Sequence, residues 1–160
     1  MSNGEIKLKT AKETIESFVA KLDEFTNETN TKFATFREEF LLAANMEMEQ
    51  VKKLNQEELF DYAYALYGYA SYIQDQINRQ KVVYDLCNDQ LQKMVAKNND
   101  KFSPYTKHEA KMQLIVVDNE YANSIDGYRQ IAGARIQELD GKVYELKRKA
   151  DILTEKGKRL

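Results

Sequence analysis

The 160-residue sequence contains one proline, one cysteine, one histidine and six glycines, and it contains no tryptophan. Because Cys87 is alone, an internal disulfide is excluded, and its place on an apolar helix face predicts packing as a small hydrophobe. Because His108 is alone, a histidine-based metal cluster or a Cys-His nucleophile pair would need other chains. No carboxylate pair has acid/base spacing. We therefore expect no enzyme activity, no cofactor and no metal.

Long apolar runs are also missing. No run approaches the ~18 residues of a membrane span, and the N-terminus lacks the apolar core of a signal peptide. These absences predict a cytoplasmic protein without a membrane partner. Gly127, Gly133 and Gly141 lie within a helical pattern and form no phosphate-cradling loop, so we expect them to allow close helix approach or local bending.

What remains is rich in Glu, Lys, Gln and Ala, which is typical of a single all-α domain, here residues 1–160. One helix is predicted over 55–97, where apolar residues recur at steps of three and four. Asn55 and Glu58 give it a capping-box start. Its apolar face, a coiled-coil-like seam interrupted once, comprises Leu59, Tyr62, Leu66, Tyr69, Ile73, Ile77, Tyr84, Cys87, Leu91 and Met94.

A second long helix is predicted over 104–157. Pro104 suits a first helical turn, and Thr106 with Glu109 repeats the capping-box pattern. The polar linker 98–102 is short, so the two helices should form a long antiparallel hairpin with arms of roughly 60–70 Å. The apolar face of the second arm comprises Leu114, Val117, Tyr121, Ile125, Tyr128, Ala132, Ile136, Leu139, Val143, Leu146, Ala150 and Leu153.

An additional N-terminal helical region is predicted over 11–53, after a flexible leader at 1–10. Weak helix formers from Thr26 to Thr31 predict either one helix with a weak middle or two helices with a break there. Its apolar stripe should pack against the hairpin or another subunit. The stripe comprises Ile15, Phe18, Val19, Leu22, Phe25, Phe33, Phe36 and Phe40.

Six tyrosines lie between Asp61 and Asp85 and widen the apolar face of the first long helix. Tyrosine is favoured at protein interfaces, and it also stacks on bases in single-strand binders. No Lys or Arg occurs near the cluster before Arg79, which favours an oligomer interface over base stacking. The predicted homo-oligomer interface comprises Tyr62, Leu66, Tyr69, Tyr72 and Ile73.

Charge is distributed unevenly along the chain, whose net charge is −2. Residues 1–60 carry 8 basic and 12 acidic side chains, whereas residues 141–160 carry 7 basic and 3 acidic ones. A basic end attracts polyanions, but cations are also favoured at helix C-termini for electrostatic reasons alone. Both explanations of the basic end stay open.

The order of these features resembles the phage recombination mediators of the UvsY type, over roughly residues 60–155. The matching features are the run from Leu66 to Ile73 inside a long helix with a basic end, a short polar linker, and a Y-x-K-x-E-x-K-x-x-L pattern that opens the second helix. That pattern comprises Tyr105, Lys107, Glu109, Lys111 and Leu114, with Asp118, Tyr128, Leu139 and a basic helical end after it.

The resemblance implies a self-assembling, all-α accessory protein that binds single-stranded DNA, in the host cytoplasm if it is phage-encoded. It also implies partners: a RecA-like recombinase, which such proteins help to load, and the single-strand-binding protein that covers the DNA. The DNA-binding residues that it implies are five lysines at the hairpin tip, which together with Asp89, Asp100 and Glu109 carry a net charge of +2. They are Lys93, Lys97, Lys101, Lys107 and Lys111.

Two other classes of function fit the same sequence. The first is a structural or assembly protein, such as a scaffold-like coiled coil, that acts through its aromatic stripes and binds no nucleic acid. The second is a small inhibitor or adaptor that presents its acidic N-terminal half to a basic partner.

Overall fold

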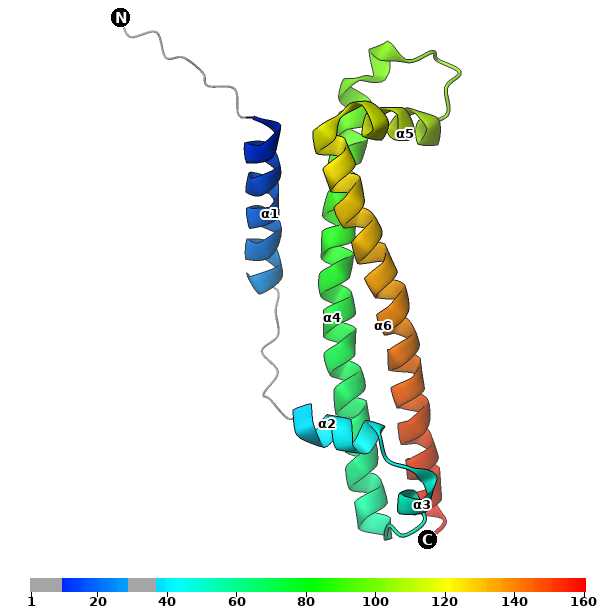
Figure 1. The fold of residues 1–160 in the computed structure, drawn as a ribbon. Helices are drawn as coiled ribbons and strands as arrows, with labels where there is room; N and C mark the ends of the chain where they lie inside the picture. The colour runs from blue at the N-terminus through cyan, green and yellow to red at the C-terminus, as the bar shows by residue number, and fades with distance from the viewer. Residues whose placement is uncertain (1–9, 29–36) are drawn as a thin grey trace, which may run out of the picture. The chain divides into compact units, whose positions relative to one another are not determined.

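The computed structural model describes residues 10–28 and 37–160, and all regular structure within these ranges is helical. The prediction of an all-α fold is confirmed: α4 packs against α6 as a helical hairpin, with an additional helix on the N-terminal side (Figure 1). The elements are α1 (Ala11–Glu28), α2 (Arg37–Ala44), α3 (Met48–Val51), α4 (Gln56–Lys97), the 3-10 turn η1 (Asn99–Lys101), α5 (His108–Asp118) and α6 (Glu120–Lys158).

Parts of the predicted N-terminal region lie outside the described residues. These parts are positions 1–9 of the leader, the end of the weak stretch at 29–31, and the aromatic residues Phe33 and Phe36.

Capping boxes start α4 and α1. The predicted box of α4 is confirmed, because the amide of Asn55 donates to Glu58 Oε2 at 2.8 Å and the amide of Glu58 donates to Asn55 Oδ1 at 2.9 Å. Thr10 and Glu13 make the same reciprocal pair before α1, at 3.0 and 3.3 Å. Each box satisfies two amides that the first helical turn leaves without partners.

The second predicted arm is wrong as one continuous helix. Asn119 has extended backbone angles, φ −123° and ψ 118°, and separates α5 from α6. Its amide closes α5 by donating to the carbonyl of Ile115 at 3.0 Å, and its Oδ1 accepts from the amide of Ala122 at 3.0 Å at the start of α6. The predicted cap at Thr106 is also wrong, because α5 begins after Lys107.

The described helices group into two compact units, and α4 and α6 pass through both. Unit 2 contains residues 37–80 and 134–160. Short side chains such as Ala63, Ala70 and Ala150 share this core with Leu59 and Leu66. Its core comprises Ala43, Val51, Leu59, Ala63, Leu66, Ala70, Ile73, Ile77, Val143, Leu146, Ala150 and Leu153.

Unit 1 contains residues 10–28 and 81–133, and its core is built by α1, α4, α5 and α6. Cys87 is fully buried in this core, as the sequence predicts, and burial raises the pKa of its thiol to about 11. The core comprises Leu22, Cys87, Leu91, Val95, Ile115, Ala122 and Ile125, whereas the predicted core residues Leu114 and Val117 are exposed. The prediction of a single domain stays a prediction.

Two glycines of α6 do not serve close packing. A Cβ added at Gly127 or Gly141 would meet no atom within 4 Å, whereas one added at Gly157 would lie 2.9 Å from the Phe60 ring. We expect Gly127→Ala and Gly141→Ala to stabilise the protein by about 0.5–1 kcal/mol each, because alanine loses less backbone entropy in a helix. Urea unfolding measures this change. A loss of stability in either variant would show that the small residue is needed there.

Candidate nucleic-acid interface

The candidate interface is the turn of the hairpin in unit 1, residues 93–111, which we call the tip. The side-chain amide of Asn98 donates to the carbonyl of Met94 at 2.8 Å and closes the end of α4. After η1, Phe102 turns its ring toward the core of unit 1. These two contacts fix the path of the chain on both sides of η1.

Two of the five predicted DNA-binding lysines are held by neighbouring side chains. Lys93 forms an ion pair with Asp89 at 2.8 Å, which partly neutralises it. Lys111 donates to the amide oxygen of Asn99 at 2.7 Å and so ties α5 to η1. Because Asn99 is neutral, Lys111 keeps its charge at the tip.

The other three lysines, Lys97, Lys101 and Lys107, are exposed. Within residues 10–28 and 37–160, their side chains have no ion pair or hydrogen bond. The five tip lysines against Asp89, Asp100 and Glu109 give a local net charge of +2. Unpaired ammonium groups at a loop are available for phosphate oxygens, because no internal partner has to be displaced.

Tyr105 is the residue that sequence reasoning missed as a site. The amide of Thr106 donates to the carbonyl of Ser103 at 3.0 Å, which closes a four-residue turn with Pro104 and Tyr105 at its corners. Proline fixes the backbone angle φ at the first corner, and the ring of Tyr105 is 94% exposed. The Ser-Pro-x-Thr sequence is the local signal for this turn, although Pro104 also fits the first turn of a helix.

The exposed tyrosine lies between Lys101 and Lys107 in sequence, on a turn whose backbone is fixed. An aromatic ring beside ammonium groups is the combination that single-strand binders use, since the ring stacks on an unpaired base while the cations contact phosphates. A ring in this position can do so without a rearrangement of the core.

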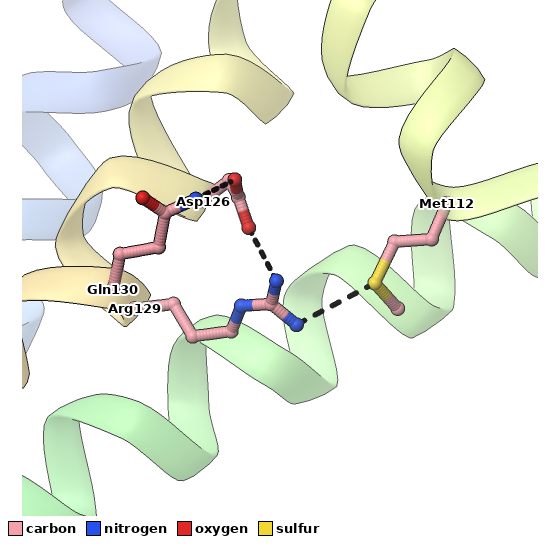
Figure 2. Close-up of polar contacts among 4 residues, drawn as sticks. All are labelled: Met112, Asp126, Arg129 and Gln130. Atoms are coloured by element: carbon pink, nitrogen blue, oxygen red, sulfur yellow. Dashed lines mark hydrogen bonds and ion pairs between the residues drawn. The ribbon is translucent and has the colours of Figure 1, made fainter. Parts of the chain in front are cut away.

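Figure 2 shows a partly buried polar network of four side chains. Asp126, which is 9% exposed, accepts from Arg129 at 2.6 Å and from Gln130 at 2.8 Å. The guanidinium of Arg129 also lies 3.6 Å from the sulfur of Met112. The network therefore joins the first part of α6 to α5, the helix that carries Lys111.

We expect Asp126→Ala to destabilise the protein by about 1–3 kcal/mol, because it leaves the half-buried guanidinium of Arg129 without its carboxylate. Asp140→Ala, at an exposed position of the same helix, should change stability by less than about 0.5 kcal/mol. Urea unfolding with matched protein concentrations compares them. An equal effect of the two substitutions would contradict a structural role for the network.

The predicted interface residues belong to unit 2, where Leu66 and Ile73 are buried, Tyr62 and Tyr69 are partly buried and Tyr72 is exposed. Leu66 is 1% exposed and Ile73 is 9% exposed, so both pack inside the core of the unit, where another subunit cannot reach them. Tyr69 stacks on Phe40 of α2, with ring centroids 5.4 Å apart, so Phe40 packs on the hairpin. On the other side, Tyr69 stacks on Tyr72 at 6.4 Å.

The basic end of the chain is partly neutralised within α6. Lys149 forms an ion pair with Glu145 at 3.1 Å and Lys158 forms one with Glu155 at 2.9 Å. Hydrogen bonds from these lysines lower the pKa of both carboxyl groups. Arg148 on this helix and Arg159 in the turn after it remain exposed.

No family model, curated protein or solved structure matches the chain. None of the described helices combines the length and apolar character needed to cross a membrane. Within the same residues, no group of three or more His, Cys, Asp or Glu side chains is arranged to hold a metal ion.

Proposed function

We propose that the chain is a homo-oligomeric accessory protein that binds single-stranded DNA through its tip and assists the loading of a RecA-like recombinase onto DNA covered by single-strand-binding protein. The DNA-binding part is supported by the tip itself. The recombinase part is supported only by the resemblance of residues 60–155 to mediators of the UvsY type.

The observation that carries the proposal is the pairing of an exposed ring with unpaired cations on one loop. Tyr105 is 94% exposed, and Lys101 and Lys107 flank it without side-chain partners in the part of the chain that the structure describes. Duplex DNA keeps its bases stacked inside, so a stacking ring favours single strands, while lysines alone would bind either form.

Self-association is part of the proposal because one tip is a weak site. The net charge of −2 for the whole chain and of +2 for the tip gives a single copy little attraction for a polyanion. When several tips share one strand, each further contact becomes intramolecular, and the overall affinity rises by orders of magnitude.

The test is a comparison of labelled single-stranded and duplex oligonucleotides of equal length by fluorescence anisotropy, at one salt concentration. We expect tighter binding of the single strand. Equal affinity for both forms would show that the lysines bind without base stacking, and absence of binding to both would refute the proposed function.

The substitution Tyr105→Ala is expected to weaken single-strand binding by roughly 5- to 150-fold, the range that corresponds to loss of one stacked base. Tyr105→Phe keeps the ring and should bind like the unmodified protein. Anisotropy titrations of both variants measure the difference. If the alanine variant binds as tightly as the phenylalanine variant, the ring does not contact the DNA.

A second function, assembly or adaptor activity without nucleic acid, is favoured by the surface of unit 2. Leu42 is 63% exposed and Tyr64 is 82% exposed, on a face with acidic neighbours. A stable oligomer that binds no oligonucleotide at low salt would support this second function.

A further inference from the structure

A groove on unit 2 combines aromatic and acidic side chains. It lies between α2 and the first part of α4 and has a volume of about 1000 Å³. Leu42 and Tyr64 supply exposed apolar surface, and Glu39, Glu58 and Asp61 line the groove; among the lining residues that the structure describes, none is Lys or Arg. We call this surface the acidic groove. Its acidic residues predict an occupant with basic side chains, and its exposed apolar residues predict that the occupant also carries apolar side chains.

The outer face of α6 in the same unit has the complementary character. Tyr144, Arg148, Ile152 and Lys156 follow one another at steps of four, which places them on one side of the helix. Arg159, in the turn after α6, lines the same depression as Arg148, Ile152 and Lys156. Tyr144 is 67% exposed and Ile152 is 50% exposed. We call these five residues the basic stripe.

Two acidic residues also border the basic stripe, in a shallow depression of about 480 Å³. Both already have partners within the chain: Asp151 accepts from the Tyr67 hydroxyl, and Glu155 pairs with Lys158 at 2.9 Å. The Tyr67 hydroxyl is neutral, so Asp151 keeps its negative charge. With Glu155 paired to Lys158, the three cations Arg148, Lys156 and Arg159 outnumber Asp151, and the stripe keeps a net positive charge for an outside partner.

The acidic groove and the basic stripe adjoin each other. Tyr67 lines the groove and Asp151 lines the depression beside the stripe, and the hydrogen bond between them bridges the two surfaces. A surface with acidic character on one side of a line and basic character on the other is complementary to itself after a rotation of 180° about that line, because the rotation turns the surface over and exchanges its two sides.

We propose that a second copy of this chain docks on this surface in a two-fold arrangement, in which each acidic groove receives the basic stripe of the other copy. The inference rests on the self-association part of the proposed function and names the surface that makes it. The groove-to-stripe contact forms twice in each dimer, so every charge pair and every apolar contact between the two surfaces occurs twice.

Charge reversal on either side tests the arrangement. Glu39→Lys with Asp61→Lys gives a groove variant, and Arg148→Glu with Arg159→Glu gives a stripe variant. Each is expected to raise the dissociation constant of the dimer at least about 10-fold, because like charges then face each other at both contacts. Sedimentation equilibrium measures the constant, and circular dichroism verifies the helical content.

Mixing the two variants supplies the decisive result. In a mixed dimer, lysines of one groove face glutamates of one stripe, and the native groove faces the native stripe, so association should return to within about 3-fold of the unmodified protein. A matched control for the groove variant, Asp85→Lys with Asp140→Lys, makes the same charge change at exposed positions outside both surfaces and should associate normally.

The failures are distinguishable. A monomeric unmodified protein would overturn both this inference and the self-association in the proposed function. An oligomer whose mass is unchanged by the groove and stripe variants, or whose association is not restored on mixing, would overturn this surface alone. Oligonucleotide binding through the tip is measured in a separate experiment, and its outcome affects neither the test of self-association nor the test of this surface.

Discussion

Replacing Lys97, Lys101 and Lys107 together with glutamate is expected to weaken single-strand binding at least about 100-fold. Each phosphate contact on a single strand contributes about −0.7 to the slope of log affinity against log salt concentration. One contact is therefore worth roughly 5-fold in affinity at 0.1 M salt relative to 1 M salt, and three contacts together are worth about 10²-fold. Reversal of the charges adds repulsion. The helical content and the oligomer mass should not change, because these side chains have no partners within the described residues.

The matched control reverses three exposed cations outside the tip, by Lys53→Glu, Lys81→Glu and Arg135→Glu. The total charge of the two variants is the same, so a general electrostatic effect would weaken both equally. A loss confined to the tip variant locates the phosphate contacts there. Equal losses would mean that the tip is not the site.

Leu91→Ala is expected to destabilise the protein by about 2–5 kcal/mol. Leu91 is fully buried in the core of unit 1, and its truncation removes apolar contacts and leaves a cavity that the surrounding helices can fill only in part. Since small domains are stable by only about 5–15 kcal/mol, this loss should be visible as a large fall in the urea midpoint.

Leu114→Ala makes the same change of side chain at a residue that is 50% exposed. It should cost less than about 1 kcal/mol, because half of the side chain already contacts water. The helical spacing alone places Leu114 and Leu91 in the core alike, so the difference between the two variants tests the exposed placement of Leu114. Equal losses of stability in the two variants would mean that Leu114 is buried in the core, as the helical spacing predicts.

Much of the hairpin follows from local sequence. The start of α4 is predictable because the capping box of Asn55 and Glu58 acts within one helical turn. The buried face of α4, which includes Leu59, Leu66 and Leu91, follows from the 3.6-residue period of the apolar residues. The side chains missed on this face are alanines such as Ala63 and Ala70, whose low hydrophobicity hides them from a pattern of large residues.

The structure around the tip is less predictable, because the same local sequence is compatible with a continuous helix and with a helix end or a turn. The apolar spacing of the sequence continues across Asn119, so the pattern alone predicts one helix. The break comes from Asn119, whose amide donates to the last turn of α5 and whose side-chain oxygen accepts from the first turn of α6. The break changes which face of α5 is buried, so Ile115 enters the core in place of Leu114. Similarly, Pro104 fits either a helix start or a turn, and the hydrogen bond from Thr106 to Ser103 decides for the turn.

The measurement that tests the central claim most directly is the affinity of the purified protein for a labelled single-stranded oligonucleotide over a series of salt concentrations, with the mass recorded by light scattering. The proposal predicts saturable binding by an oligomer, with an affinity that falls steeply as salt rises, since each released counterion contributes to the slope. A defined oligomer that fails to bind the strand at the lowest salt concentration would contradict it and favour an assembly protein.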